Sequence, residues 1–220
     1  MRCFGLTPEQ VLSREPSPRA DRFPSLAYSM IYGALSFGVV SVVAYTIWGF
    51  RLIRGAAGMY SATALIYIVL AGLALSHLVR GTGTAPRFAV LFGIAFLAYA
   101  VAWCAFWFGL GGKYYADFWG SVAGLAILTW LVRRAFGQRD RLLLCFVTVL
   151  ALHSAGYYLG VYLYGNVRGS TGRLLFGAGH GLGFGAAMGF LLFHAQAALK
   201  ARLANARPAT ESASARSPAP

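Results

Sequence analysis

Acidic residues are scarce in this 220-residue sequence, in which six carboxylates stand against 19 basic residues. Charged residues make up only 11% of the chain, whereas soluble domains carry about 25%. Hydrophobic residues, in contrast, make up 58%. So few charges cannot cover the surface of a soluble protein. The composition therefore predicts an all-α, multi-pass membrane protein.

Cysteine is also scarce, and no catalytic signature is present. Cys3, Cys104 and Cys145 form no CxxC pair, which argues against a disulfide framework or a thiolate metal site. We expect them to act as small buried hydrophobic residues. The HExxH, P-loop and GxSxG motifs are absent as well. The sequence therefore names no catalytic residue and leaves open whether the protein is an enzyme.

The net charge of +13 does not indicate a nucleic-acid partner. The basic residues are spread between the apolar segments, as loop charges that flank membrane helices are, and they form no block. Seventeen of them are Arg and two are Lys. With abundant Ala and Gly, this usage suggests a GC-rich bacterial genome. We therefore expect the chain in the bacterial cytoplasmic (inner) membrane.

Six apolar segments come close to the ~20 residues that cross a bilayer core. Backbone amides in lipid must be paired internally, so each segment is expected to be a helix. Residues 1–25 are predicted to be a cytoplasmic N-terminal segment, in which Thr7, Pro8 and Gln10 start a short helix. Residues 26–199 form the transmembrane domain, and residues 200–220 a disordered cytoplasmic tail. The predicted spans are 26–50, 58–79, 88–110, 114–132, 142–164 and 173–199.

The basic residues also predict the orientation. With the N-terminus in the cytoplasm, 14 of them fall on the cytoplasmic side and five on the other. Basic loops stay inside, so both termini are expected to be cytoplasmic. An aromatic belt at the outer ends agrees with this orientation, and it comprises Trp48, Trp107, Tyr114, Tyr115, Trp119, Tyr162 and Tyr164.

Glycine recurs at helical spacing in the last two spans. In the sixth span every fourth residue from Gly177 to Gly189 is glycine, and Gly156 and Gly160 form a GxxxG pair in the fifth. A stripe of small residues lets another helix backbone approach closely in lipid. The pattern predicts a tight helix pair or an oligomer through these spans. The alternative is that the small residues leave room for a flat cofactor or a lipid.

All four histidines fall within predicted spans, where ionisable groups are costly and often functional. At a rise of ~1.5 Å per residue, His153 and His180 lie at similar depth in the outer half of the membrane. His77 and His194 lie near the cytoplasmic ends of their spans. His180 and His194 are separated by ~21 Å along one helix and by only ~40° around it. The sixth span thus presents two imidazoles in two tiers.

This spacing resembles that of the di-haem membrane cytochromes b, in which histidines about two heptads apart on one helix bind stacked haems. Imidazole is the usual protein ligand of haem iron. The resemblance implies b-type haem, with His153 and His180 as ligands of an outer haem and His77 and His194 as ligands of an inner one. It also implies membrane electron transfer, with quinone or other membrane subunits as partners.

Two further functions remain open. The chain is alternatively a non-redox structural or assembly subunit, or a bundle that binds a lipid or small molecule, in which the histidines make only local hydrogen bonds. A solute channel or carrier ranks third. Asp117 is the acid nearest to a span, and its place in a first helical turn suits the positive end of the helix dipole. No carboxylate falls in mid-membrane, which argues against a proton-coupled transporter.

Overall fold

The computed structural model describes residues 4–14 and 23–214 of the chain, with side chains as far as residue 205. All regular elements in these two ranges are helical, which confirms the predicted all-α class. In chain order they are α1 (Pro8–Leu12), α2 (Leu26–Gly49), α3 (Ala56–Ile66), the π-helix η2 (Tyr67–Ala71), α4 (Gly72–Ser76), α5 (Thr84–Gly109), α6 (Ala116–Ala135), α7 (Leu142–Asn166), α8 (Gly169–Ala195) and α9 (Ala197–Ser214).

Five stretches of helix in the described part of the chain are long and apolar enough to cross a membrane, and they indicate a membrane protein. The predicted span at 114–132 is helical too, as α6, but it is not among the five. The reason lies in its ends, because α6 carries Asp117 in its first turn and Arg133 and Arg134 in its last. The five stretches are Leu26–Gly49, Ala56–Ser76, Thr84–Gly109, Leu142–Asn166 and Gly169–Asn205.

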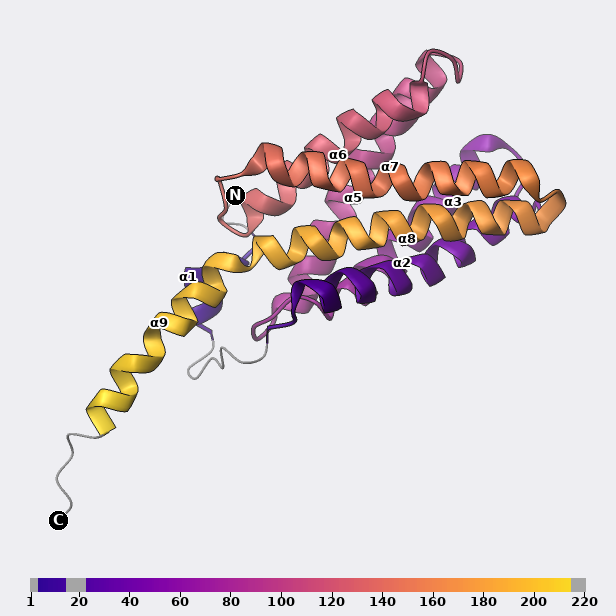
Figure 1. Cartoon of the computed structure of the whole chain (residues 1–220). Coiled ribbons are helices and arrows are strands. Elements are labelled where there is room, and N and C mark those ends of the chain that lie inside the picture. Colours follow the sequence, from indigo (N-terminus) through magenta and orange to yellow (C-terminus); the bar gives the residue numbers. More distant parts are fainter. Residues whose placement is uncertain (1–3, 15–22, 215–220) are drawn as a thin grey trace.

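Helix α8 lies between α2 and α7, and the three form a closely packed slab (Figure 1). One row of glycines on α8 faces α2. A Cβ atom added at Gly185 would overlap the backbone of Gly33, and one added at Gly189 would overlap the backbone of Ser29. The two helices therefore touch backbone to backbone, as the small-residue stripe predicts. The sequence did not indicate that the partner of this stripe is α2.

A second row of glycines on α8 faces α7. A Cβ atom added at Gly156 of α7 would lie 2.5 Å from the Cα atom of Gly183. A Cβ atom at Gly160 would lie 2.7 Å from the carbonyl oxygen of Phe176. The tight helix pair predicted between the fifth and sixth spans is thus present, and it uses glycines that the four-residue repeat does not include.

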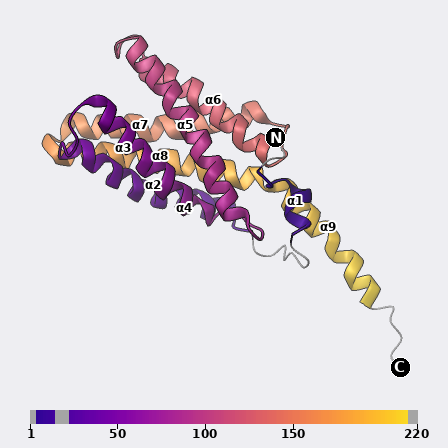
Figure 2. The ribbon, with the colours of Figure 1, turned by 180° about the vertical axis from the view of Figure 1, so that it is seen from behind.

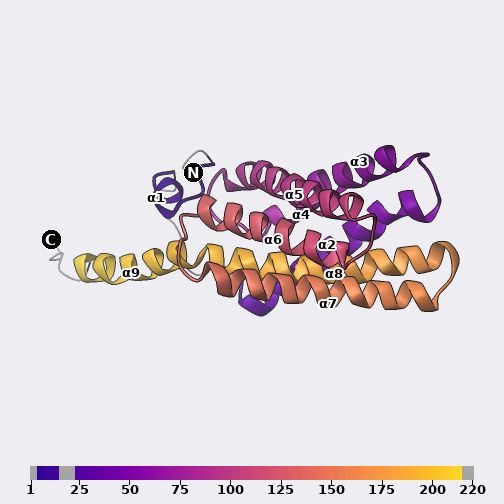
Figure 3. The ribbon, with the colours of Figure 1, turned by 90° about the horizontal axis from the view of Figure 1, so that it is seen from above.

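The α5–α6 hairpin crosses this slab at an angle (Figures 2 and 3). Helix α3 packs on α2, while η2 and α4 pack on α5. Phenylalanine rings fill the place where the hairpin meets the slab. Phe37 of α2 stacks on Phe184 of α8 with ring centroids 4.7 Å apart, and Phe96 of α5 lies 5.8 Å from Phe184. At this junction, bulky aromatic rings keep the hairpin away from the slab, whereas glycines hold α2, α7 and α8 close together within the slab.

The N-terminal helix α1 begins at Pro8, as predicted, with Thr7 before it. The hydroxyl of Thr7 donates to the side-chain oxygen of Gln10 at 3.0 Å. Helix α1 packs on the start of α9, where Glu9 forms an ion pair with Arg202. Helix α1 and the start of α9 therefore lie together at one end of the bundle (Figure 1).

Residues 200–214 are helical in the structure as part of α9, where the sequence predicts a disordered tail. Two leucines account for the difference at the start of the segment. Leu199 and Leu203 are one helical turn apart, and both are buried against Val11 of α1. The alanine- and serine-rich composition of the segment hides this short apolar face. Residues 215–220 lie outside the described residues.

Candidate functional site

The structure brings together His153 of α7 and His180 of α8. Their rings are in contact edge to face, with centroids 5.3 Å apart. Both side chains are buried, with 1% and 7% of their surface exposed. The glycine contacts between α7 and α8 hold the two helices at the distance that this ring contact requires.

His153 is tied to the neighbouring hairpin. Its Nε2 atom lies 3.0 Å from the hydroxyl of Tyr99 on α5, at hydrogen-bond distance. Its ring also contacts Phe184 at 5.5 Å. This hydrogen bond links the slab to the α5–α6 hairpin at a buried point, so His153 has a structural partner on one of its two nitrogens.

His180 differs, because neither of its ring nitrogens has a hydrogen-bond partner within the described chain. Buried polar side chains almost always have a partner, and a buried donor or acceptor without one costs about 1–3 kcal/mol. The imidazole is surrounded by rings whose centroids lie 5.3–6.5 Å away, namely Tyr45, Tyr67, His153, Tyr157, Phe176 and Phe184. His180 is therefore a polar group that a ligand could satisfy.

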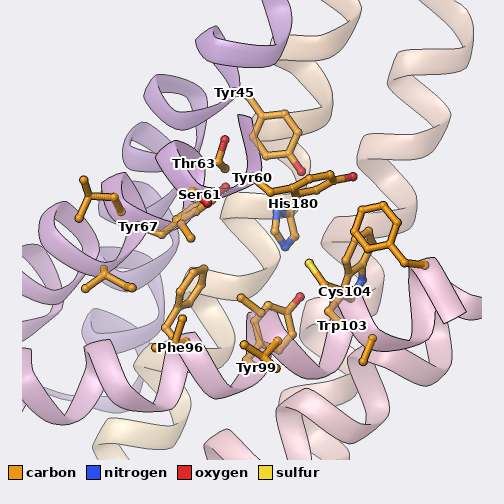
Figure 4. A pocket seen from close by; sticks show the side chains of 18 of the residues that line it. Tyr45, Tyr60, Ser61, Thr63, Tyr67, Phe96, Tyr99, Trp103, Cys104 and His180 are labelled. Atoms are coloured by element: carbon orange, nitrogen blue, oxygen red, sulfur yellow. The ribbon is translucent and has the colours of Figure 1, made fainter. Parts of the chain in front are cut away.

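His180 borders a pocket of about 760 Å³ between α3–η2 and α5 (Figure 4). Figure 4 shows the imidazole projecting from α8 toward a space bordered by Tyr60, Phe96 and Tyr99. The volume falls in the range of about 300–1,000 Å³ that is typical of small-molecule sites. The lining is aromatic and aliphatic, with hydroxyls from Tyr, Ser and Thr, and it includes no Asp, Glu, Lys or Arg among the described residues.

A second chamber of about 400 Å³ continues the pocket toward the end of the bundle where α2 and α7 finish. The two chambers share Tyr45, Tyr60, Thr63, Trp103 and Tyr157. The second is lined in part by rings that the sequence assigned to an interfacial belt, namely Trp48, Trp107 and Tyr164. Part of the predicted belt thus lines a cavity.

The larger chamber opens sideways between α3 and α5. Leu65, Leu97 and Val101 line it, and all three are also exposed on the outer surface of the bundle. In an apolar helix that crosses a membrane, such a surface faces lipid. The opening therefore connects the hydrocarbon core of the bilayer with the His180 ring.

The π-helix η2 begins at Tyr67, on the wall of the pocket. The hydroxyl of Tyr67 lies 2.5 Å from Ser41 Oγ, and Ser41 donates in turn to the carbonyl oxygen of Gly177 at 2.6 Å. Single π-helical turns inside α-helices are frequent at functional sites. This one begins at the residue whose hydroxyl bonds to Ser41 of the slab, and the Tyr67 ring stacks on Phe37 with centroids 5.2 Å apart.

The structure does not bring His77 and His194 together by a ring contact within the described chain. His77 is exposed at the end of α4. His194 is half-buried and contacts Phe190, with ring centroids 4.5 Å apart. In addition, no three His, Cys, Asp or Glu side chains in the described ranges are grouped so that they could hold a metal ion.

The three cysteines differ in setting. Cys145 is buried and accepts a hydrogen bond from Arg133 at 3.2 Å, so it is more than a small hydrophobic residue. Cys104 is a free thiol in the wall of the pocket. Cys3 lies outside the described residues.

Sequence reasoning missed the tyrosines of the pocket, although a signal was present. Tyr45, Tyr67, Tyr99 and Tyr157 each lie inside a predicted span, as histidines 153 and 180 do. Tyrosine hydroxyls usually find a partner when they are buried, so several mid-span tyrosines indicate a shared polar site. The positions of the histidines alone do not indicate these four tyrosines.

Comparison of the chain with protein-family models, with curated proteins and with solved structures finds no match.

Proposed function

We propose that this chain is a multi-pass membrane protein that binds a neutral, lipid-soluble small molecule in the pocket beside His180. One observation carries the proposal: a buried imidazole that has no hydrogen-bond partner among the described residues borders a pocket that opens toward lipid. This is the lipid- or small-molecule-binding alternative from the sequence, now attached to a specific site.

The lining supports a neutral occupant. A charged group moved out of water costs several kcal/mol or more unless it is paired. Among the described residues, the pocket wall offers no Lys, Arg, Asp or Glu to pair with it. The pocket offers the hydroxyls of Tyr45 and Tyr60 as well as the His180 nitrogens, so a few hydrogen bonds can orient the bound molecule. A largely apolar pocket with a few convergent polar groups is typical of small-molecule sites.

Native mass spectrometry of protein purified in mild detergent tests this proposal. We expect a bound molecule on the unmodified chain. Ala100→Phe places a ring in the pocket wall and should remove that molecule. The matched control is Ile127→Phe on the exposed surface of α6, which should retain it. No bound molecule on the unmodified chain, or equal occupancy in the Ala100→Phe variant, would overturn the proposal.

We further propose six membrane passes with both termini in the cytoplasm of a bacterial cell. The contact between α1 and α9 supports an even number of passes, since it requires both ends of the bundle to lie on one side. With α6 as the sixth pass, this condition is met. Reporter fusions after Gly112 and after residue 205 test the orientation: the first should report the periplasm and the second the cytoplasm.

Electron transfer through b-type haem is the second candidate function. The observation that favours it is the ring contact of His153 and His180, in which three of the four nitrogens have no hydrogen-bond partner in the part of the chain that the structure describes. As packed here, the two rings touch and the glycines hold α7 against α8, so no haem fits between them. Haem ligation by this pair therefore requires the two helices to separate.

An absorption spectrum of the purified protein separates the two candidates. The protein is produced with haem supplied, and the spectrum is recorded before and after reduction with dithionite. Haem binding predicts a Soret band and an α band that His180→Phe removes. A protein that carries a neutral molecule and shows neither band supports the first candidate alone.

A further inference from the structure

We propose that the molecule bound beside His180 is a lipid-soluble quinone, that is, a flat ring with carbonyl groups and an apolar tail. This inference rests on the proposed function and names the class of its ligand. Three features of the pocket carry it: its aromatic walls, its hydrogen-bonding groups and its opening toward lipid.

The first feature is the aromatic lining of the inner end. Rings from four helices surround the space next to His180, and Trp103 of α5 forms part of its wall, stacked on Trp107 with centroids 5.2 Å apart. Aromatic side chains pack well against another flat ring, in offset or edge-to-face arrangements. A branched or spherical molecule would leave such walls partly uncovered.

The second feature is the polar chemistry. A neutral imidazole has one N–H donor and one acceptor nitrogen, and His180 uses neither within the described chain. The hydroxyls of Tyr45 and Tyr60, on α2 and α3, point into the same pocket region in Figure 4. Donors on three different helices suit a head group with more than one acceptor. A quinone carries two carbonyl oxygens on opposite sides of its ring.

The third feature is the route out of the pocket. The opening between α3 and α5 is lined by Leu65, Leu97 and Val101, which also face the lipid. An apolar tail can leave the pocket there without crossing a polar surface. Because the described lining of the pocket includes no charged side chain, it cannot pair with the charge of a fatty acid or of a phospholipid head group. A diacylglycerol is neutral, but it has no flat ring to fill the aromatic end.

Titration with menaquinone-4 and ubiquinone-2 tests the inference, with quenching of tryptophan fluorescence as the signal. We expect saturable binding that is stronger than that of dioleoylglycerol, measured by competition. Ala100→Phe should abolish the saturable part. This control separates binding in the pocket from partition of the quinone into the micelle.

Variants of His180 add a second readout. His180→Phe removes the donor and should weaken quinone binding by about tenfold, as the loss of one hydrogen bond does. His180→Gln keeps a donor and should retain most of the affinity. His194→Phe on the same helix lies outside the pocket and should change nothing. Thermal unfolding of each variant shows whether the fold is intact.

The outcomes distinguish the two proposals. If dioleoylglycerol binds in a manner that depends on Ala100 and the quinones do not, the quinone inference fails and the proposed function stands. If His180→Phe and His194→Phe bind quinone equally well while Ala100→Phe does not, the assigned role of His180 is wrong. If neither probe binds and the purified chain carries no molecule, both proposals fail.

Discussion

The slab of α2, α7 and α8 and the side formed by α3, η2, α4 and α5 use opposite ways of packing. In the slab, glycines let helix backbones touch, as at Gly33 and Gly185. On the other side, rings such as Tyr60 and Trp103 hold the helices apart and line a pocket. The difference shows how one small bundle combines a rigid support with a cavity.

Helix α8 belongs to both regions because its faces differ. Gly177, Gly181, Gly185 and Gly189 face α2, whereas Gly179 and Gly183 face α7. A third row, spaced by four residues, consists of Phe176, His180 and Phe184. The ring of His180 contacts Tyr67 of η2 and that of Phe184 contacts Phe96 of α5, so this row meets the other side. The slab therefore fixes the position of His180, and the aromatic side leaves space in front of it.

The largest effect is expected from a bulky residue within the slab. Gly185→Leu forces a side chain into the backbone of Gly33, and overpacking costs about 1–3 kcal/mol, or more where a backbone must move. We expect a severe loss of folded protein, measured by size-exclusion chromatography and thermal unfolding in detergent.

The matched control is Gly165→Leu in α7, where an added Cβ atom meets no other atom within 4 Å. This variant should fold like the unmodified chain. Equal behaviour of the two variants would contradict the backbone contact between α2 and α8.

An intermediate effect is expected where the two regions join. Ser41→Ala leaves the buried Tyr67 hydroxyl without its partner, which should lower the free energy of unfolding by about 1–3 kcal/mol. The double variant Ser41→Ala with Tyr67→Phe removes both partners and should recover part of this loss. Thermal unfolding of the two single variants and the double variant measures the coupling.

Ser36→Ala serves as the control for this junction. Ser36 lies on the same helix, and its hydroxyl donates to the carbonyl oxygen of Gly33, one turn earlier. Its replacement should have a much smaller effect. A loss of stability as large as that of Ser41→Ala would show that the hydrogen bond across the junction contributes no more than a bond within one helix.

The smallest effect on stability is expected at the lipid-facing opening. Leu97 is exposed, so Leu97→Ala should change the free energy of unfolding by less than about 0.5 kcal/mol. It should nevertheless weaken binding of menaquinone-4, because it removes apolar contact from the pocket mouth. A variant that loses stability but keeps its affinity would place Leu97 in the core rather than at the opening.

The sequence predicts the helices well because long apolar runs have only one way to pair their backbone amides in lipid. The second predicted span, 58–79, matches α3, η2 and α4 over 56–76. No feature of the sequence predicts the π-helical turn that begins at Tyr67. The fifth span, 142–164, matches α7 within two residues. For α6, its charged ends make the sequence signal weaker than for the other helices.

The rotation of each helix could not be predicted, and the site depends on it. The pairing of His153 with His180 follows from their depth on adjacent helices, and the structure contains that pair. Whether a ring faces lipid, a neighbour or a cavity depends on side-chain packing across helices far apart in sequence. For that reason the pocket between Tyr60 and Trp103 is visible only in the folded bundle.

The most direct test of the lipid-facing pocket uses Cys104 as a reporter. In reconstituted vesicles, with the other two cysteines replaced by serine, N-ethylmaleimide should alkylate this thiol from the pocket. Ala100→Phe, or saturating menaquinone-4, should slow alkylation severalfold, whereas Ile127→Phe should not. Equal rates in all four conditions would contradict the account, because they would show that Cys104 does not share a cavity with the bound molecule.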